Sequence, residues 1–172
     1  LPTWDMGTVG GQSANLTEQI IANLFQDHLD NRVAAGELAL VDSWTDTWWE
    51  EQRLRFFGFG FSAGDEADGL NNVLKELRFL EEAGFSKTAV EEAKEDYRAS
   101  LDQFLASAAT ITDDEYAENY VWHYLAGVAA DGPESAHARL SSTLDNLTTE
   151  GLNNHFRWIM GQVAPLVLAV GN

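Results

Sequence analysis

The four histidines are the residues of this sequence best suited to bind a catalytic metal, and there are no cysteines. A hydrolytic zinc ion of the H-x-x-E-H type requires two imidazoles four positions apart on one helical face, with a glutamate beside them to activate water. No two histidines have that spacing, and none is adjacent to a glutamate; they are His28, His123, His137 and His155. We therefore predict no catalytic residue and no metal site in this chain, and interpret each histidine as a helix-surface or partly buried side chain.

Three carboxylates cluster in the turn GDEADG, at Asp65, Glu66 and Asp68. Calcium takes six to eight oxygen ligands, which a longer loop with alternating acids supplies. Acids at the start of a helix are favoured because the N-terminal end of a helix carries a partial positive charge. We interpret this cluster as the beginning of a helix.

The segment 42–61, DSWTDTWWEEQRLRFFGFGF, contains three tryptophans and four phenylalanines. Asp42 and Asp46 flank Trp44 on one strand face, as in the floor of a glycosidase. Four residues of strand separate the two acids by roughly 13 Å, whereas paired catalytic carboxyl groups lie about 5–9.5 Å apart. Two interpretations of the tryptophans remain: an exposed platform for a ligand, or the buried face of a sheet, which a core of several helices favours.

The charge of the chain excludes several classes of partner. Twenty-eight acids against ten bases give a net charge of −18, which repels nucleic acid and anionic lipid surfaces. The acids indicate a solvated surface or an attraction for basic peptides. The lack of cysteine excludes thiol catalysis, and no apolar run reaches the 18 or so residues of a membrane span.

The pattern of apolar residues predicts helices, a hairpin and a closing strand within one domain. Apolar residues recur at helical spacing in most of the chain, and alternate with period two only around the aromatic segment. After an irregular lead-in over residues 1–14, we expect a helix to about residue 33, a hairpin at 37–63, helices at 65–83, 88–108, 112–128, 133–146 and from 148 or 149, and a strand at 165–170.

Several phrases resemble the pitrilysin/insulinase family of zinc metallopeptidases. LKELRFLEEAGFSKTAVEEAKEDYRASLDQF is similar to the family's paired helices, including the Ala-Lys pair Ala93 and Lys94. LDNLTTEGLNNHFRWIM followed by PLVLAVGN resembles its closing helix and strand. The first helix, ending at Asn31 and Arg32, resembles the corresponding family helix with its terminal arginine.

This resemblance implies an α+β roll, in which several helices pack against a mostly antiparallel sheet. The phrases resemble the second, non-catalytic member of a pair of domains that face each other around a chamber. Zinc and the H-x-x-E-H motif are then expected in the catalytic domain of the same parent chain or in a paired subunit, with a peptide as substrate. No apolar strand precedes Leu16, so we expect a fragment of a longer chain, truncated at its N-terminal end. Bacterial members suggest a periplasmic or extracytoplasmic location.

Arg32 is the one site residue that the resemblance implies, because an arginine and a tyrosine of the non-catalytic half help to hold the substrate backbone in active members. No tyrosine follows Arg32; the next aromatic residue is Trp44. The alternative for Arg32 is a helix-end arginine that interacts with carbonyl dipoles. Two alternatives for the whole chain remain: a catalytically inactive scaffold or assembly homologue, and an aromatic-rich ligand-binding module.

Overall fold

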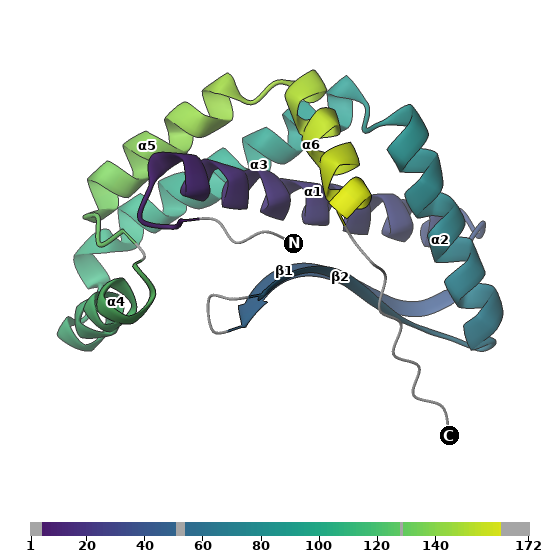
Figure 1. Ribbon diagram of the computed structural model, residues 1–172, viewed down its shortest axis with the longest axis horizontal. Coiled ribbons are helices and arrows are strands. Elements are labelled where there is room, and N and C mark those ends of the chain that lie inside the picture. The colour runs from purple at the N-terminus through teal and green to yellow at the C-terminus, as the bar shows by residue number, and fades with distance from the viewer. Residues whose placement is uncertain (1–4, 51–53, 128, 163–172) are drawn as a thin grey trace.

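Helices form an arch over a small β-hairpin in the computed structural model of the chain, which describes residues 5–50, 54–127 and 129–162 (Figure 1). The expected α+β class is confirmed: one compact domain, mostly helical, with a two-stranded antiparallel sheet. The strand expected at 165–170 lies outside the described residues. The elements are α1 (Val9–Ala34), β1 (Leu40–Glu50), β2 (Leu54–Ala63), α2 (Glu66–Ala83), α3 (Lys87–Ser107), the short 3-10 helix η1 (Ala108–Thr110), α4 (Asp113–Ala126), α5 (Pro133–Asn146) and α6 (Thr149–Gln162).

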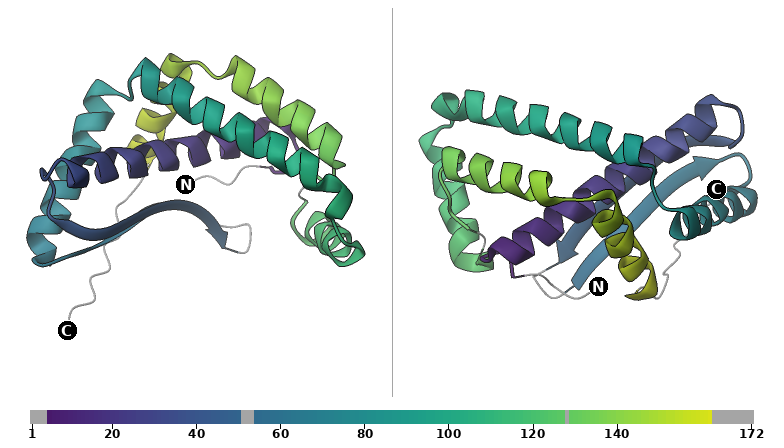
Figure 2. Two further views of the ribbon diagram at one scale, coloured as in Figure 1. Left: turned by 180° about the vertical axis from the view of Figure 1, so that it is seen from behind. Right: turned by 90° about the horizontal axis from the view of Figure 1, so that it is seen from above.

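Helix α1 is the centre of the fold. It lies over the hairpin, while α3, α5 and α6 cross its other side and α2 packs near its C-terminal end (Figures 1 and 2). Both of its apolar stripes are therefore buried, and each large side chain removed from water contributes about 1.5–3 kcal/mol. These stripes are Leu16, Ile20 and Leu24, and Ile21, Phe25 and Leu29.

Helix α1 begins at Val9, within the segment expected to be an irregular lead-in. Two adjacent glycines disfavour a helix there, but Thr8 caps it by accepting a hydrogen bond from the Gly11 amide at 3.1 Å. Glycine is also required at position 11, because a Cβ there would lie 2.0 Å from the Asp5 carbonyl oxygen. The cap and this close approach explain the earlier start.

The hairpin has one face in the core and one outside it. Thr45 pairs with Phe59, and Phe57 precedes Phe59 by two residues, so these three residues share the face that lies against α1. Phe59 meets the edge of Phe25 of α1, with ring centroids 5.7 Å apart. Residues of the opposite parity, including Trp44, lie on the other face.

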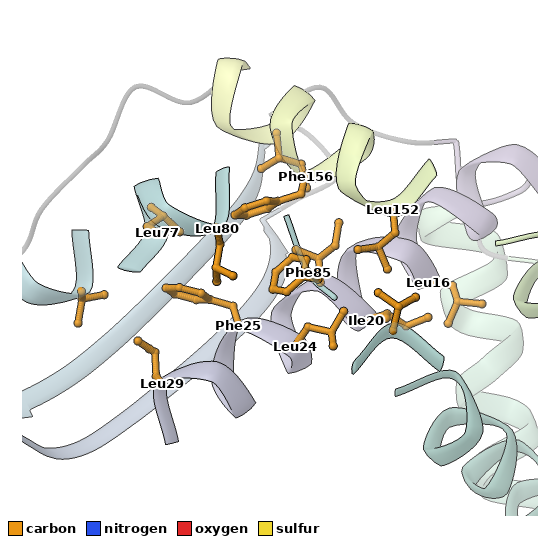
Figure 3. Packing of buried hydrophobic residues seen from close by; sticks show 14 of the residues in the cluster. Leu16, Ile20, Leu24, Phe25, Leu29, Leu77, Leu80, Phe85, Leu152 and Phe156 are labelled. Carbon is orange, nitrogen blue, oxygen red and sulfur yellow. The ribbon is translucent and has the colours of Figure 1, made fainter. Parts of the chain in front are cut away.

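The turn between α2 and α3 is held by α6. Gly84 ends α2 with a φ of 77°, and Phe85 is buried against Phe156 of α6 at a centroid distance of 5.2 Å (Figure 3). Asn153 accepts a hydrogen bond from the Phe85 amide at 2.8 Å and donates one to the Phe85 carbonyl at 3.1 Å. The side-chain amide of Asn153 thus satisfies both backbone groups of Phe85, as a neighbouring strand would.

Lys94, of the Ala-Lys pair, is buried beneath the end of α5. Its Nζ donates to the Leu147 carbonyl at 2.9 Å and lies 3.3 Å from the Glu91 carboxylate. A cation at a helix C-terminal end interacts favourably with the helix dipole. Lys94 therefore joins α3 to the turn between α5 and α6.

Replacing Asn153 with alanine tests the turn clamp. We expect Asn153→Ala to lower the free energy of unfolding by about 1–3 kcal/mol, because the buried Phe85 amide loses its acceptor. Urea denaturation measures the change. Asn154→Ala is the control, since this exposed neighbour accepts only from Arg157 of the same helix and should change stability by less than about 0.5 kcal/mol. Equal losses in the two variants would contradict the role of the clamp.

Candidate functional site

Arg32 lies at the junction of α1 and β1, in the last turn of the helix. The Arg32 carbonyl accepts the amides of Glu37 and Leu38, at 2.9 and 3.3 Å, so the backbone folds back at this residue. The guanidinium forms ion pairs with two carboxylates: Nη1 with Glu37 and Nη2 with Glu76 of α2, the latter at 3.0 Å. The sequence places this arginine correctly at the helix end, where its interactions are with side chains.

Glu76 is the centre of this group of charges, which we call the Arg32 cluster: His28, Arg32, Glu37 and Glu76. Glu76 is buried, and its second carboxylate oxygen lies 2.7 Å from Nε2 of His28 on α1. The His28 ring stacks on Phe79 of α2, with centroids 6.1 Å apart. Two residues of α1 thus share one carboxylate of α2, which fixes the two helices relative to each other.

The two ion pairs of Arg32 differ in how readily another acceptor could replace the carboxylate. Glu76 is buried and held by two donors, so the bond from Nη2 anchors the guanidinium. The Glu37 side chain is 50% exposed, and an ion pair that water can reach contributes only about 0–1 kcal/mol. A peptide carbonyl or carboxylate could replace Glu37 on Nη1 while Glu76 keeps the side chain in place.

The histidines lie on four different helices, α1, α4, α5 and α6. Three pair with a carboxylate of another helix: His28 with Glu76, His137 with Asp102 at 2.7 Å, and His155 with the buried Glu18 at 3.1 Å. In the part of the chain that the structure describes, no group of three or more His, Asp or Glu residues could hold a metal ion. These pairs could not be predicted from the sequence, because each joins segments far apart in the chain.

The acidic turn at Asp65 begins α2, as interpreted from the sequence. The Asp65 carboxylate accepts a hydrogen bond from the Asp68 amide at 2.9 Å, which is the geometry of a helix cap. Glu66 and Asp68 lie exposed in the first turn of the helix.

The aromatic hairpin has a buried face and also an exposed tryptophan, so each of the two interpretations of its sequence describes part of it. Phe57, Phe59 and Phe61 pack against the core, so this face is structural. Trp44 lies on the opposite face and is 51% exposed, with its indole against Gly60, where a Cβ would lie 2.3 Å from the ring. The side chains of Asp46, Trp48 and Trp49 lie outside the described residues. The indole of Trp44 is therefore accessible to a ligand or a neighbouring domain.

A groove of about 250 Å³ between α1 and α3 is acidic. Asp27 of α1 and Asp96 of α3 both line it. Burial raises the pKa of Asp27 above the ordinary 3.8, and Asp30 and Asp96 raise it further. Tyr97 also lines the groove; its hydroxyl donates to Gln19 at 2.9 Å, and burial raises its pKa. Sequence reasoning missed this groove because its acids lie on two separate helices.

Asp27→Asn tests the electrostatics of the groove. A raised pKa means that the folded state binds the proton more tightly than the unfolded state. The contribution of Asp27 to stability is therefore greatest below its unfolded pKa and is lost as the pH rises through the folded pKa. We expect Asp27→Asn to raise the Tm at pH 7, with the gain shrinking as the pH falls through the folded pKa and vanishing below the unfolded value of 3.8.

The control is Glu95→Gln, which removes one charge from an exposed position of α3. Thermal melts of both variants at neutral and acidic pH separate the local effect from the general relief of the −18 charge. If Glu95→Gln raises the Tm at pH 7 as much as Asp27→Asn does, the groove has no special electrostatic strain.

No protein-family model matches the sequence, and no curated protein sequence matches it. Solved structures of proteases nevertheless share its fold. The first half of the periplasmic protease PqqL from Escherichia coli superposes with a TM-score of 0.80 at 16% identity, over 94% of this chain and 35% of that chain. A predicted insulinase family protease from Yersinia pestis gives a TM-score of 0.78 at 16% identity, over 93% and 35%.

The periplasmic protease PqqL from Escherichia coli gives a TM-score of 0.79 at 17% identity, over 93% of this chain and 18% of that chain. The chain therefore spans about one third or less of the length of these proteases. The likeness covers nearly the whole chain and establishes its fold: that of one domain within insulinase-like proteases.

Proposed function

We propose that the chain is the non-catalytic, chamber-closing and substrate-positioning domain of a zinc-dependent peptidase of the pitrilysin/insulinase family. The observation that carries this proposal is the likeness of fold to proteases over 93–94% of the chain, although the chain spans only 35% or 18% of their length. The sequence lacks two histidines four positions apart, so the zinc motif is assigned to a partner domain.

In this proposal the chain closes over an extended peptide while the partner domain supplies zinc and the general base. Closing a chamber excludes water and orients the peptide bond, which lowers the entropic part of the barrier. Arg32 holds the peptide backbone through Nη1 in place of Glu37, with Glu76 as its anchor. The domain is a positioning element and does not touch the reacting atoms.

The location is part of the same proposal. Two of the neighbouring structures are of a periplasmic protease, and we propose a periplasmic location for this chain on that likeness. None of its described helices has the length and apolar character that crossing a membrane requires.

The test compares the 172-residue chain with the full-length parent protein on a quenched fluorescent peptide. We expect the chain alone to bind no stoichiometric zinc and cleave nothing, and the parent to cleave in a chelator-sensitive manner. Arg32→Ala in the parent should lower kcat/KM about 10–100-fold, because a charge-assisted hydrogen bond to the substrate contributes about 1.5–3 kcal/mol.

Arg98→Ala is the matched control, since Arg98 forms a similarly exposed ion pair with Asp145. Urea denaturation of both variants shows whether lost activity reflects lost folding, because Arg32→Ala also removes a donor from Glu76. Cleavage and zinc binding by the chain alone would overturn the proposal. If the parent protein contains further domains of this fold but has no peptidase activity, the scaffold function would replace the peptidase proposal.

A second candidate function follows from Trp44, whose exposed indole could stack on a sugar or another flat ligand. Calorimetric titration with soluble oligosaccharides tests it. Binding that Trp44→Ala abolishes and Phe79→Ala retains would favour a ligand-binding module, whereas the peptidase proposal predicts no binding. Phe79 is a suitable control because it is an aromatic side chain of similar exposure on α2.

A further inference from the structure

Helix α4 presents an apolar face to solvent. Tyr116, Tyr120 and Tyr124 recur every four residues and so lie on one side of the helix, with Val121 beside them. Tyr120, Val121 and Tyr124 are 63%, 53% and 86% exposed. We call these four residues the α4 tyrosine face. Figures 1 and 2 show α4 at the end of the molecule opposite α2, hanging below the ends of α3 and α5.

The helix that carries this face is well defined at both ends. Thr112 and Glu115 form a capping box, in which the Glu115 carboxylate accepts the Thr112 amide at 2.7 Å and Thr112 Oγ1 accepts the Glu115 amide at 3.3 Å. Gly127 ends the helix in the left-handed conformation and lies against Gly7, before α1. The face is therefore held in place by its ends, although it contributes little to the core.

Exposed aromatic clusters on an ordered helix are typical of protein interfaces, where tyrosine supplies a large contact area at a small cost in side-chain entropy. The charges around this face indicate the chemistry of the partner. Asp113, Asp114 and Glu118 are exposed on the same helix, and the whole chain carries a charge of −18. A complementary surface would have an apolar groove bordered by lysine or arginine.

We propose that the α4 tyrosine face docks on another folded domain of the same polypeptide, in an apolar groove bordered by basic residues. The proposal rests on the proposed function in one respect: the match spans only 35% or 18% of the proteases that share this fold, and the proposed function supplies the further domain that covers the face. A membrane is disfavoured because anionic headgroups repel Asp113 and Asp114 in the first turn of α4, and a second copy because it brings two like charges together.

The experiment is hydroxyl-radical footprinting of the full-length parent protein and of the 172-residue chain under identical conditions. We expect Tyr120 and Tyr124 to be oxidised about tenfold more slowly in the parent than in the chain, as for residues at the centre of an interface. Phe79 of α2, at the opposite end of the molecule, is exposed and should be oxidised at equal rates in both. In the parent, Glu118→Lys should restore much of the oxidation of the two tyrosines, whereas Glu95→Lys on α3 should not.

Equal oxidation of the tyrosines in both proteins would overturn the proposal, as would a gene that encodes no further domain. Protection of the isolated chain that rises with its concentration would assign the face to a second copy. Protection that requires phosphatidylglycerol vesicles would assign it to a membrane, and either result overturns domain docking. The readout is independent of catalysis, so a parent without peptidase activity whose tyrosines are protected would refute the proposed function and support the docking.

Discussion

The burial of both apolar stripes of α1 is the constraint on which the rest of the structure depends. A helix that is apolar on one stripe needs one covering layer, but α1 carries two stripes and must be covered on opposite sides. The hairpin covers one side through Phe59 against Phe25, and the helical layer covers the other through Phe156 and Leu152 (Figure 3). The arch of helices over a short sheet is the arrangement that satisfies both requirements.

The same constraint explains where the charged residues of the interior are found. Helices that cross a central helix also bury its polar positions, and a buried carboxylate requires a donor close by. Glu18 of α1 is paired with His155 of α6, and Glu76 of α2 with His28 and Arg32 of α1. These pairs join α1 to its covering helices at defined positions. Two histidines, His28 and His155, thus hold α1 to α2 and to α6.

Most of the helices and strands could be predicted from local patterns in the sequence. Contacts between distant segments could not, because local patterns carry no information about them. The acidic turn at the start of α2 and the helices expected at 65–83 and 133–146 are read from adjacent residues, and the structure confirms each. The early start of α1 was missed because it depends on the approach of Asp5 to Gly11, which residue types alone do not reveal. Arg32 was located at its helix end, but its anchor Glu76 lies 44 residues away. The position of Asp27 and Asp96 in the same groove was missed because these two residues are also far apart in the sequence.

Because the core around α1 provides most of the stability of the domain, surface residues outside this core can be changed without unfolding it. Tyr120 and Tyr124 contribute little burial in this chain, so the stability of its fold does not depend on them. Arg32 differs, because its bond to Glu76 belongs to the fold while its bond to Glu37 faces solvent. Substitutions in the α4 tyrosine face should therefore leave the chain folded, whereas substitutions at Arg32 should lower stability in addition to any effect on the substrate binding that we propose. For Arg32, a functional assay has a clear meaning only beside a denaturation curve.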